Sequence, residues 1–270
     1  MVKVSGYTDL DPARWREYPE IITESLWLLG ARDRSGPHAG DYWGNFVPQI
    51  PYQLIRRFTR EGEAVVDLFS GMGTTLIECR RLGRHGLGVE LNPKVSEAAR
   101  RRVLEAANPY DVRTETLAAD STQPETGDLL SELLRDLGHD GAQLLILHPP
   151  YHDIIRFDAG PGDLSAAEDL DRFLESFREA GRNAWNLLQP GRFLGLVIGD
   201  KYSDGEWVPL GFECMAVLRE LGFQLKAINI KDIQGNERGK GKNLNLWRYR
   251  SLKLGFYIFK HEYVMVFRRP

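Results

Sequence analysis

The chain has 270 residues, of which 42% are hydrophobic and 27% are charged. This composition is typical of a folded globular protein and excludes disordered, collagen-like and coiled-coil chains. The 35 Lys and Arg residues are balanced by 38 Asp and Glu residues, so no overall positive field is expected to attract nucleic acid.

The sequence also indicates a cellular compartment. The longest apolar runs, at residues 144–147 and 193–198, are far shorter than the roughly 18 residues of a membrane-spanning helix. The first residues, MVKVSGYTDLDPARW, lack the apolar core of a signal peptide. Cys79 and Cys214 are too few for a disulfide framework. We therefore expect a protein without membrane spans that works in the reducing cytoplasm.

The first predicted elements alternate between strand and helix. Residues Ala64–Phe69 form a short, apolar, β-branched run, which favours a buried strand. Residues Thr74–Leu82 contain no Gly or Pro and end before a glycine, so they are predicted to form a helix. A second strand is expected at His85–Leu91. The dipeptide Asn92-Pro93 then provides a favourable cap and first residue for another helix.

The same alternation continues towards the C-terminus. Ser165 and Glu168 form a candidate capping box, after which apolar residues repeat at helical spacing. A second helix is predicted from Leu210 to Leu221. Further strands are predicted at Thr116–Asp120, Gln143–His148, Arg192–Gly199 and Phe223–Lys231.

This pattern predicts an α/β fold. Strands that alternate with helices of this length pair in parallel, because each helix returns the chain to the same edge of the sheet. The last predicted strand, His261–Phe267, has no obvious crossover helix before it, so we expect it to run antiparallel.

A glycine turn follows the first of these strands. Gly71 and Gly73 come shortly after Asp67, at the carboxyl end of the strand, where α/β folds bind cofactors. A dinucleotide fingerprint would require a third glycine where Leu76 stands, and the chain contains no phosphate-binding Gly-Lys-Ser/Thr loop. Glu90 and Asp120 end the next two predicted strands. Carboxylates around a glycine turn suit a cofactor that carries a nucleoside but no phosphates.

The segment LILHPPY, residues 145–151, ends another buried strand with two prolines and an aromatic residue. With the glycine turn, it gives the chain a resemblance to the S-adenosylmethionine-dependent DNA amino-methyltransferases, which modify adenine N6 or cytosine N4. The resemblance implies a Rossmann-like class I methyltransferase fold, with a mostly parallel seven-stranded sheet and an antiparallel last strand. It also implies that S-adenosylmethionine is the cofactor.

The resemblance assigns roles to residues of this chain. It implies that the catalytic tetrapeptide is His148, Pro149, Pro150 and Tyr151. The cofactor-binding residues that it implies are Asp67, Phe69, Gly71, Gly73, Thr74, Glu90 and Asp120, with Pro48 and Gln49 from the segment Gly44–Phe58.

The chemistry explains the tetrapeptide. The lone pair of an exocyclic amine is delocalised into the ring, so a catalyst should accept hydrogen bonds from its N–H groups. Prolines offer carbonyl acceptors without competing N–H donors, and Tyr151 is expected to stack on the flipped base.

His148 stands where the family usually has Asp, Asn or Ser, so adenine and cytosine both stay open as the target base. Only a neutral imidazole can accept a hydrogen bond from the amine. Activity is therefore expected to fall as the pH drops through the ordinary histidine pKa of about 6.5 and His148 becomes protonated.

A basic segment is the predicted DNA-binding site. Residues 233–253 alternate basic, amide and aromatic side chains, which suit phosphate and base contacts. The residues predicted to bind double-stranded DNA are Arg156, Arg238, Lys240, Lys242, Arg248 and Arg250. A homodimer and a cognate restriction nuclease are left open as partners.

We treat residues 1–270 as a single methyltransferase domain, because no linker or repeat divides the chain. Within it we predict an N-terminal cofactor-closing segment (1–60), a catalytic core (61–232), a basic insertion (233–258) and the final strand (259–270).

Two other functions are weighed. An RNA or protein-glutamine N-methyltransferase would share the cofactor, and a DNA-binding relative without catalysis would explain the unusual His148. Cytosine carbon-5 methylation is disfavoured because it requires a nucleophilic cysteine, whereas Cys79 and Cys214 fall on predicted helices as core residues. No Cys or His cluster has zinc spacing, so no metal is expected.

Overall fold

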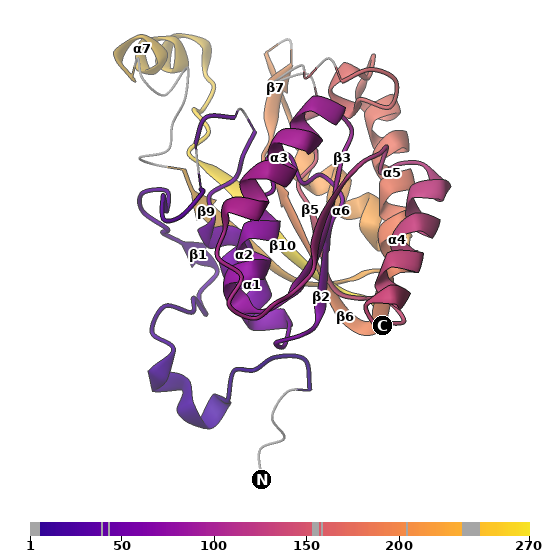
Figure 1. Cartoon of the computed structure of the whole chain (residues 1–270). Helices are drawn as coiled ribbons and strands as arrows, with labels where there is room; N and C mark the ends of the chain where they lie inside the picture. The colour runs from indigo at the N-terminus through magenta and orange to yellow at the C-terminus, as the bar shows by residue number, and fades with distance from the viewer. Residues whose placement is uncertain are drawn as a thin grey trace.

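A computed structural model describes residues 6–38, 40–42, 44–152, 157, 159–203, 205–233 and 244–270. The described chain forms an eight-stranded sheet in the order β1-β9-β10-β6-β5-β2-β3-β4, with helices on both faces (Figure 1). Helices α1, α2 and α3 cover one face, and α4, α5 and α6 cover the other.

The strands are β1 (Leu26–Trp27), β2 (Ala64–Asp67), β3 (His85–Glu90), β4 (Thr114–Ala118), β5 (Ala142–Leu147), β6 (Leu188–Ile198), β9 (Gln224–Asp232) and β10 (His261–Arg268), with β7 (Lys201–Ser203) and β8 (Glu206–Val208) as a separate pair. The helices are α1 (Gln49–Phe58), α2 (Thr74–Leu82), α3 (Pro93–Glu105), α4 (Pro124–Asp136), α5 (Leu170–Leu187), α6 (Leu210–Glu220) and α7 (Leu244–Leu254), with short 3-10 helices η1 (Pro12–Glu17) and η3 (Leu164–Ala166).

The sheet topology confirms the predicted α/β class, with a mostly parallel sheet and an antiparallel last strand. Strand β10 is antiparallel to both of its neighbours, β6 and β9, whereas the other pairs in the sheet are parallel. The strand count differs from the predicted seven by one. The additional strand is β1, a two-residue edge strand that pairs with β9 and carries no extended apolar run to indicate it.

Local signals set the ends of α2 and the start of α3 as predicted, but one prediction is wrong. Helix α2 has the predicted bounds, and the Asn92 side chain caps α3 by accepting a hydrogen bond from Lys94 N at 3.0 Å. The capping box at Ser165 does not form. The cap of α5 is Asp169, whose side chain accepts from Arg172 N at 2.8 Å, while the Ser165 hydroxyl donates to Asp163 at 2.6 Å.

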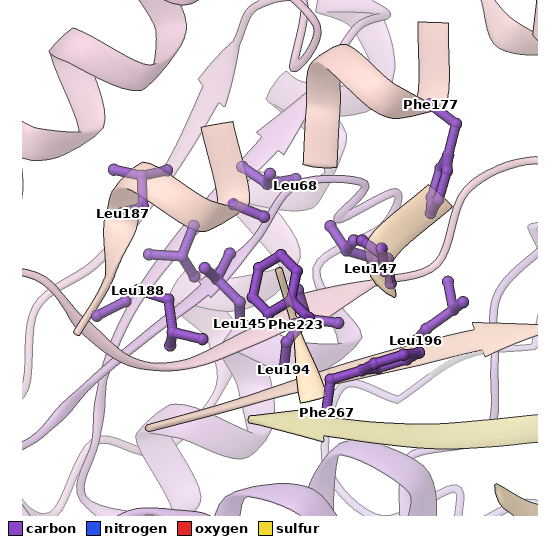
Figure 2. Close-up of a cluster of buried hydrophobic side chains, with 14 of the residues drawn as sticks. Leu68, Leu145, Leu147, Phe177, Leu187, Leu188, Leu194, Leu196, Phe223 and Phe267 are labelled. Carbon is purple, nitrogen blue, oxygen red and sulfur yellow. The ribbon is translucent and has the colours of Figure 1, made fainter. Parts of the chain in front are cut away.

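The main hydrophobic core lies between the sheet and helices α4, α5 and α6 (Figure 2). Its buried side chains include Leu145 and Leu147 of β5, Leu194 and Leu196 of β6, and Phe267 of β10. The two cysteines are buried and unpaired in α2 and α6, as predicted for core residues. The core therefore fixes β5, the strand from which the HPPY tetrapeptide extends.

Helix α7 stands away from the sheet (Figure 1). It lies in the chain between β9 and β10, and Tyr249 and Leu252 on it are 61% and 75% exposed. Among the described residues, no helix is long and apolar enough to cross a membrane. The predicted division of the chain into four segments stays a prediction.

Candidate active site

The predicted cofactor and catalytic residues come together at one edge of the sheet. Strands β2 and β5 are adjacent and parallel, with Asp67 opposite Ile146, and Leu68 N donates to Ile146 O at 3.2 Å. Because neighbouring strands lie about 4.8 Å apart, the turn after β2 and the tetrapeptide after β5 share an edge. The sequence predicted that each of these two loops follows the carboxyl end of a strand, and the structure places both there.

The glycine turn is held by backbone and carboxylate contacts. Ser70 N donates to Val89 O at 2.8 Å, and Gly71 and Gly73 have φ values of +49° and +78°, a region that favours glycine. The buried carboxylate of Asp67 accepts from Phe69 N at 3.0 Å and from the Thr75 hydroxyl at 2.5 Å. Asp67 therefore holds the two ends of the glycine turn together through Phe69 and Thr75.

Burial raises the pKa of Asp67 to about 6, against the hydrogen bonds from Thr75 and Phe69, which favour the charged form. The folded state therefore binds a proton between about pH 4 and pH 6 that the unfolded chain has released. It follows that the contribution of Asp67 to stability is lost as pH rises through this window.

We expect Asp67→Asn to remove that pH dependence, because asparagine keeps a hydrogen-bonding oxygen and does not titrate. The stability of the variant relative to the wild type should increase between pH 4 and pH 7, as measured by urea denaturation at several pH values. The exposed Asp128→Asn serves as a control and should show no such trend. Parallel stability curves for Asp67→Asn and the wild type would contradict the assignment.

Glu90 is the last residue of β3, and Asp120 lies two residues after the end of β4. Glu90 accepts from Asn92 N at 2.9 Å, and burial together with the charge of Asp163 raises its pKa. Asp120 accepts from the backbone N–H and the hydroxyl of Thr122 at 2.9 and 2.8 Å. A methyl group added at Gly162 would lie 2.2 Å from Asp120 Oδ2. Gly162 therefore lies beside Asp120, and Asp163 is close enough for its charge to act on Glu90.

These residues fit a cofactor that carries a nucleoside. Two carboxylates at neighbouring strand ends can accept hydrogen bonds from ribose hydroxyl or ring amine groups. Within the turn itself, the buried Ser70 hydroxyl has no hydrogen-bond partner among the described residues, which leaves a polar group for a ligand. Thr74 is buried at the first position of α2.

The N-terminal segment links the two loops, but through residues that the sequence analysis missed. Asn45 accepts from the Thr74 hydroxyl at 3.4 Å, and the ring of Phe46 lies 4.8 Å from that of His148. Pro48 and Gln49 were the predicted contacts. Gln49 instead binds the chain further upstream, donating to Ala31 O at 2.7 Å and accepting from Asp33 N at 3.2 Å.

The tetrapeptide is anchored on the far side by the last strands. The Tyr151 hydroxyl donates to Glu262 Oε2 at 2.7 Å, and Lys231 Nζ contacts Glu262 Oε1 at 2.9 Å. A methyl group added at Gly199 would lie 3.0 Å from the Tyr151 ring. Glu262 and Lys231 were also missed. The one signal for Glu262 is its place as an acid at the start of an otherwise apolar final strand.

The surroundings of His148 correct the expected pH dependence. Burial lowers the pKa of His148 to about 4, although the nearby Glu262 carboxylate acts in the opposite direction. The imidazole is therefore neutral at pH 5 and above. An acid limb near pH 6.5, as expected from the ordinary histidine pKa, is wrong for this environment.

Only some of the predicted DNA-binding residues can be placed. Arg248 and Arg250 lie exposed on α7, with the Arg250 guanidinium 5.1 Å from the centre of the Trp247 ring. Arg156, Arg238, Lys240 and Lys242 lie outside the described residues. Within the described ranges, no group of three or more His, Cys, Asp or Glu side chains is placed to bind a metal ion.

Comparisons with known proteins find similarity to DNA methylases in the part of the chain that includes the glycine turn. A family model described as DNA methylase matches residues 20–101, which include the glycine turn. The chain is 35% identical over 68 residues to the type II methyltransferase M.MjaII of Methanocaldococcus jannaschii, covering 24% of this chain and 13% of that protein. It is 32% identical over 94 residues to M.SmaI of Serratia marcescens, covering 35% of this chain and 31% of that protein. The matches thus span less than a third of these relatives.

Solved structures support the fold alone. The [4+2]-cyclase SpnF aligns with a TM-score of 0.52 at 12% identity, covering 89% of each chain. TrmN from Thermus thermophilus aligns with a TM-score of 0.50 at 18% identity, covering 83% of this chain and 49% of that one. The predicted resemblance to DNA amino-methyltransferases is confirmed by the family and relative matches.

Proposed function

We propose that this chain, whose residues 20–101 match the DNA methylase family, is a site-specific DNA methyltransferase that uses S-adenosylmethionine to methylate the exocyclic amine of adenine or cytosine. The observation that carries the proposal is the adjacency of the glycine turn after β2 and the His148 tetrapeptide after β5. This edge can hold a methyl donor beside a planar amine.

The cofactor would occupy the edge formed by the turn and the acids. We assign the close backbone approach to Gly71 and Gly73, and the polar contacts to Glu90, Asp120 and the Ser70 hydroxyl. Asp67, Phe69 and Thr74 shape the turn. When bound, S-adenosylmethionine would supply an electrophilic methyl group on a sulfonium.

The tetrapeptide prepares the amine. His148 and the carbonyl oxygen of Pro149 are proposed to accept the two N–H hydrogen bonds of a base that is flipped out of the duplex. These bonds would weaken the delocalisation of the nitrogen lone pair into the ring and make the amine more nucleophilic. Held in line, such groups act mainly through alignment and electrostatics. Stacking of Tyr151 on the base stays a prediction.

The test is transfer of tritium from methyl-labelled S-adenosylmethionine to duplex DNA, followed by mass spectrometry of the nucleosides. We expect N6-methyladenine or N4-methylcytosine. Label found only in RNA or in protein glutamine would favour the second enzymatic function. A protein that binds both DNA and S-adenosylmethionine without transferring label would favour the non-catalytic one.

The basic surface of α7 is proposed to contact DNA phosphates. We expect Arg248→Ala with Arg250→Ala to weaken DNA binding and to reduce the slope of log K against log salt by about 0.9 for each phosphate that the protein no longer neutralises. Adding Lys240→Ala and Lys242→Ala should extend both effects. The control is Arg172→Ala with Arg182→Ala, which removes two exposed cations of α5. Equal slopes for the two double variants would refute the assignment.

The wider setting is part of the proposal. Double-stranded DNA is the proposed substrate, and the two unpaired cysteines are consistent with the cytoplasm. A homodimer and a cognate restriction nuclease stay predictions, which size measurements and the sequence of neighbouring genes would test.

A further inference from the structure

A chain of polar contacts runs from the catalytic loop to the last two strands. His148 Nε2 lies 3.4 Å from the Tyr151 hydroxyl oxygen, and that hydroxyl donates to Glu262 Oε2 at 2.7 Å. Lys231 Nζ completes the chain at Glu262 Oε1, at 2.9 Å. Glu262 and Lys231 stand opposite each other in the β10–β9 ladder, so a regular sheet fixes the far end of the chain.

The ion pair between Lys231 and Glu262 is buried, and it keeps Glu262 ionised. The side chains of Lys231 and Glu262 are 3% and 14% exposed, so removing one partner would leave an uncompensated buried charge. Burial alone would raise the pKa of Glu262, but the charges of Lys231 and His148 and the hydrogen bonds from Lys231 and Tyr151 outweigh it, and the pKa is lowered. Glu262 is therefore an ionised carboxylate, which can only accept hydrogen bonds.

The acceptor role of Glu262 determines which group can donate in the contact between Tyr151 and His148. The single hydroxyl proton of Tyr151 is committed to Glu262, so towards His148 the tyrosine oxygen can only accept. A hydrogen bond between the two groups then requires that His148 Nε2 carries a proton and donates it. A neutral imidazole with its proton on Nε2 has its lone pair on Nδ1. The 3.4 Å contact is long for a hydrogen bond, as is common for catalytic groups before the substrate is bound.

We propose that Glu262 and Lys231 are positioning residues that hold His148 in the tautomer whose Nδ1 accepts a hydrogen bond from the target amine. Lys231 keeps Glu262 ionised, Glu262 orients the Tyr151 hydroxyl, and Tyr151 fixes the proton on His148 Nε2. The proposal rests on the proposed function, because that function assigns the amine to His148.

Among the described residues, the charges that act on His148 are those of this pair. Glu262 on β10 favours the imidazolium and Lys231 on β9 disfavours it, while Phe46 and Tyr151 pack uncharged rings against the imidazole. The two charges therefore act on the protonation of His148 in opposite directions. The proposed effect of the pair is on which ring nitrogen holds the proton.

The experiment measures the tautomer directly in the full chain without DNA. Protein containing 15N-labelled histidine is examined by NMR at pH 7, and the His148 signals are identified by their loss in His148→Asn. In the wild type we expect a protonated Nε2 and an unprotonated Nδ1. Glu262→Gln should increase the population protonated at Nδ1, because the new amide can donate to the tyrosine oxygen and release its proton towards His148.

Matched variants separate this role from a structural one. Glu220→Gln removes an exposed carboxylate of α6 and should leave the His148 signals unchanged. In a Tyr151→Phe background, Glu262→Gln should produce no further change, because the link is broken. If Glu262→Gln alone does not fold, Lys231→Met with Glu262→Gln leaves no unpaired charge and should give the same shift in tautomer.

Kinetics provide the second readout. Glu262→Gln is expected to lower kcat by about tenfold, less than the roughly 100-fold or more typical of a positioned acid–base group because Glu262 acts through Tyr151, with the KM for S-adenosylmethionine within about threefold of the wild type. A proton on Nδ1 in the wild type, or unchanged tautomer populations in folded Glu262→Gln, would overturn the inference. Because the NMR measurement needs no methyl transfer, its result is independent of whether DNA is the substrate.

Discussion

Replacing His148 with alanine is expected to lower kcat for DNA methylation by at least about 100-fold, the scale typical of losing a positioned acid–base group. The imidazole packs against Phe46 and contacts Tyr151, whereas the cofactor turn is held by Asp67 and Thr75. The Kd for S-adenosylmethionine should therefore stay within about threefold of the wild type. Single-turnover methylation and isothermal titration calorimetry measure the two effects separately.

The conservative variants test the acceptor role of His148. His148→Asn and His148→Asp each return an oxygen acceptor and should recover part of the lost rate. Full activity in His148→Asp would mean that any acceptor suffices. Full activity in His148→Ala would remove His148 from the mechanism.

The pH profile is a further check on the same residue. Since burial lowers the pKa of His148 to about 4, the rate should be flat from pH 8 to about pH 5 and fall below that. The contribution of His148 to stability should also fall below about pH 6.5, because the unfolded chain takes up a proton that the folded imidazole resists; this contribution is opposite in sign to that of Asp67. A rate that halves near pH 6.5 would show that His148 is solvated during catalysis.

Gly73→Ala is expected to destabilise the protein by about 3 kcal/mol, the sum of a left-handed backbone penalty and overpacking. Gly73 has φ +78°, and an added methyl group would lie 2.7 Å from Val103 Cγ2 on α3. To relieve this contact, the start of α2 must move away from α3 and take the glycine turn with it. The Kd for S-adenosylmethionine should rise at least about tenfold, a change of about 1.4 kcal/mol.

Gly138→Ala is the matched control for this prediction. Gly138 has φ +81°, nearly the same as Gly73, but nothing lies within 4 Å of the position of an added methyl group. Its cost should be the backbone term alone, about 1 kcal/mol. Urea denaturation and cofactor titration of both variants separate the backbone penalty from the effect of the contact with Val103. Equal losses in the two variants would mean that the contact with Val103 relaxes without moving the turn.

The sequence predicted the parts of the fold that local chemistry determines. Gly73 and Gly83 bound α2, Asn92 caps α3, and the apolar runs become β2 and β5 at neighbouring positions. The parallel pairing predicted from the alternating elements likewise places the carboxyl ends of these strands at one edge, although it does not determine that β2 and β5 are neighbours. Rules that relate sequence to structure over a few residues were sufficient for these helix ends and strands.

The features that were missed depend on long-range contacts. Glu262 reaches Tyr151 across 111 positions in the chain, and Asn45 reaches Thr74 across 29. The capping box at Ser165 was wrong because Asp163 captured the serine hydroxyl and Asp169 supplied a competing cap. The low pKa of His148 likewise arises from burial, which a spacing pattern does not record.

The stretch formed by Asn45 and Phe46 has a thermodynamic consequence. One of these consecutive residues contacts the helix that begins at the glycine turn, and the other packs on the imidazole of the tetrapeptide. Two ligands whose cavities share a wall of adjacent residues are energetically linked when occupancy of either displaces that wall. Linkage is reciprocal. If the proposed cofactor changes the affinity of the protein for DNA by some factor, DNA must change the affinity for the cofactor by the same factor.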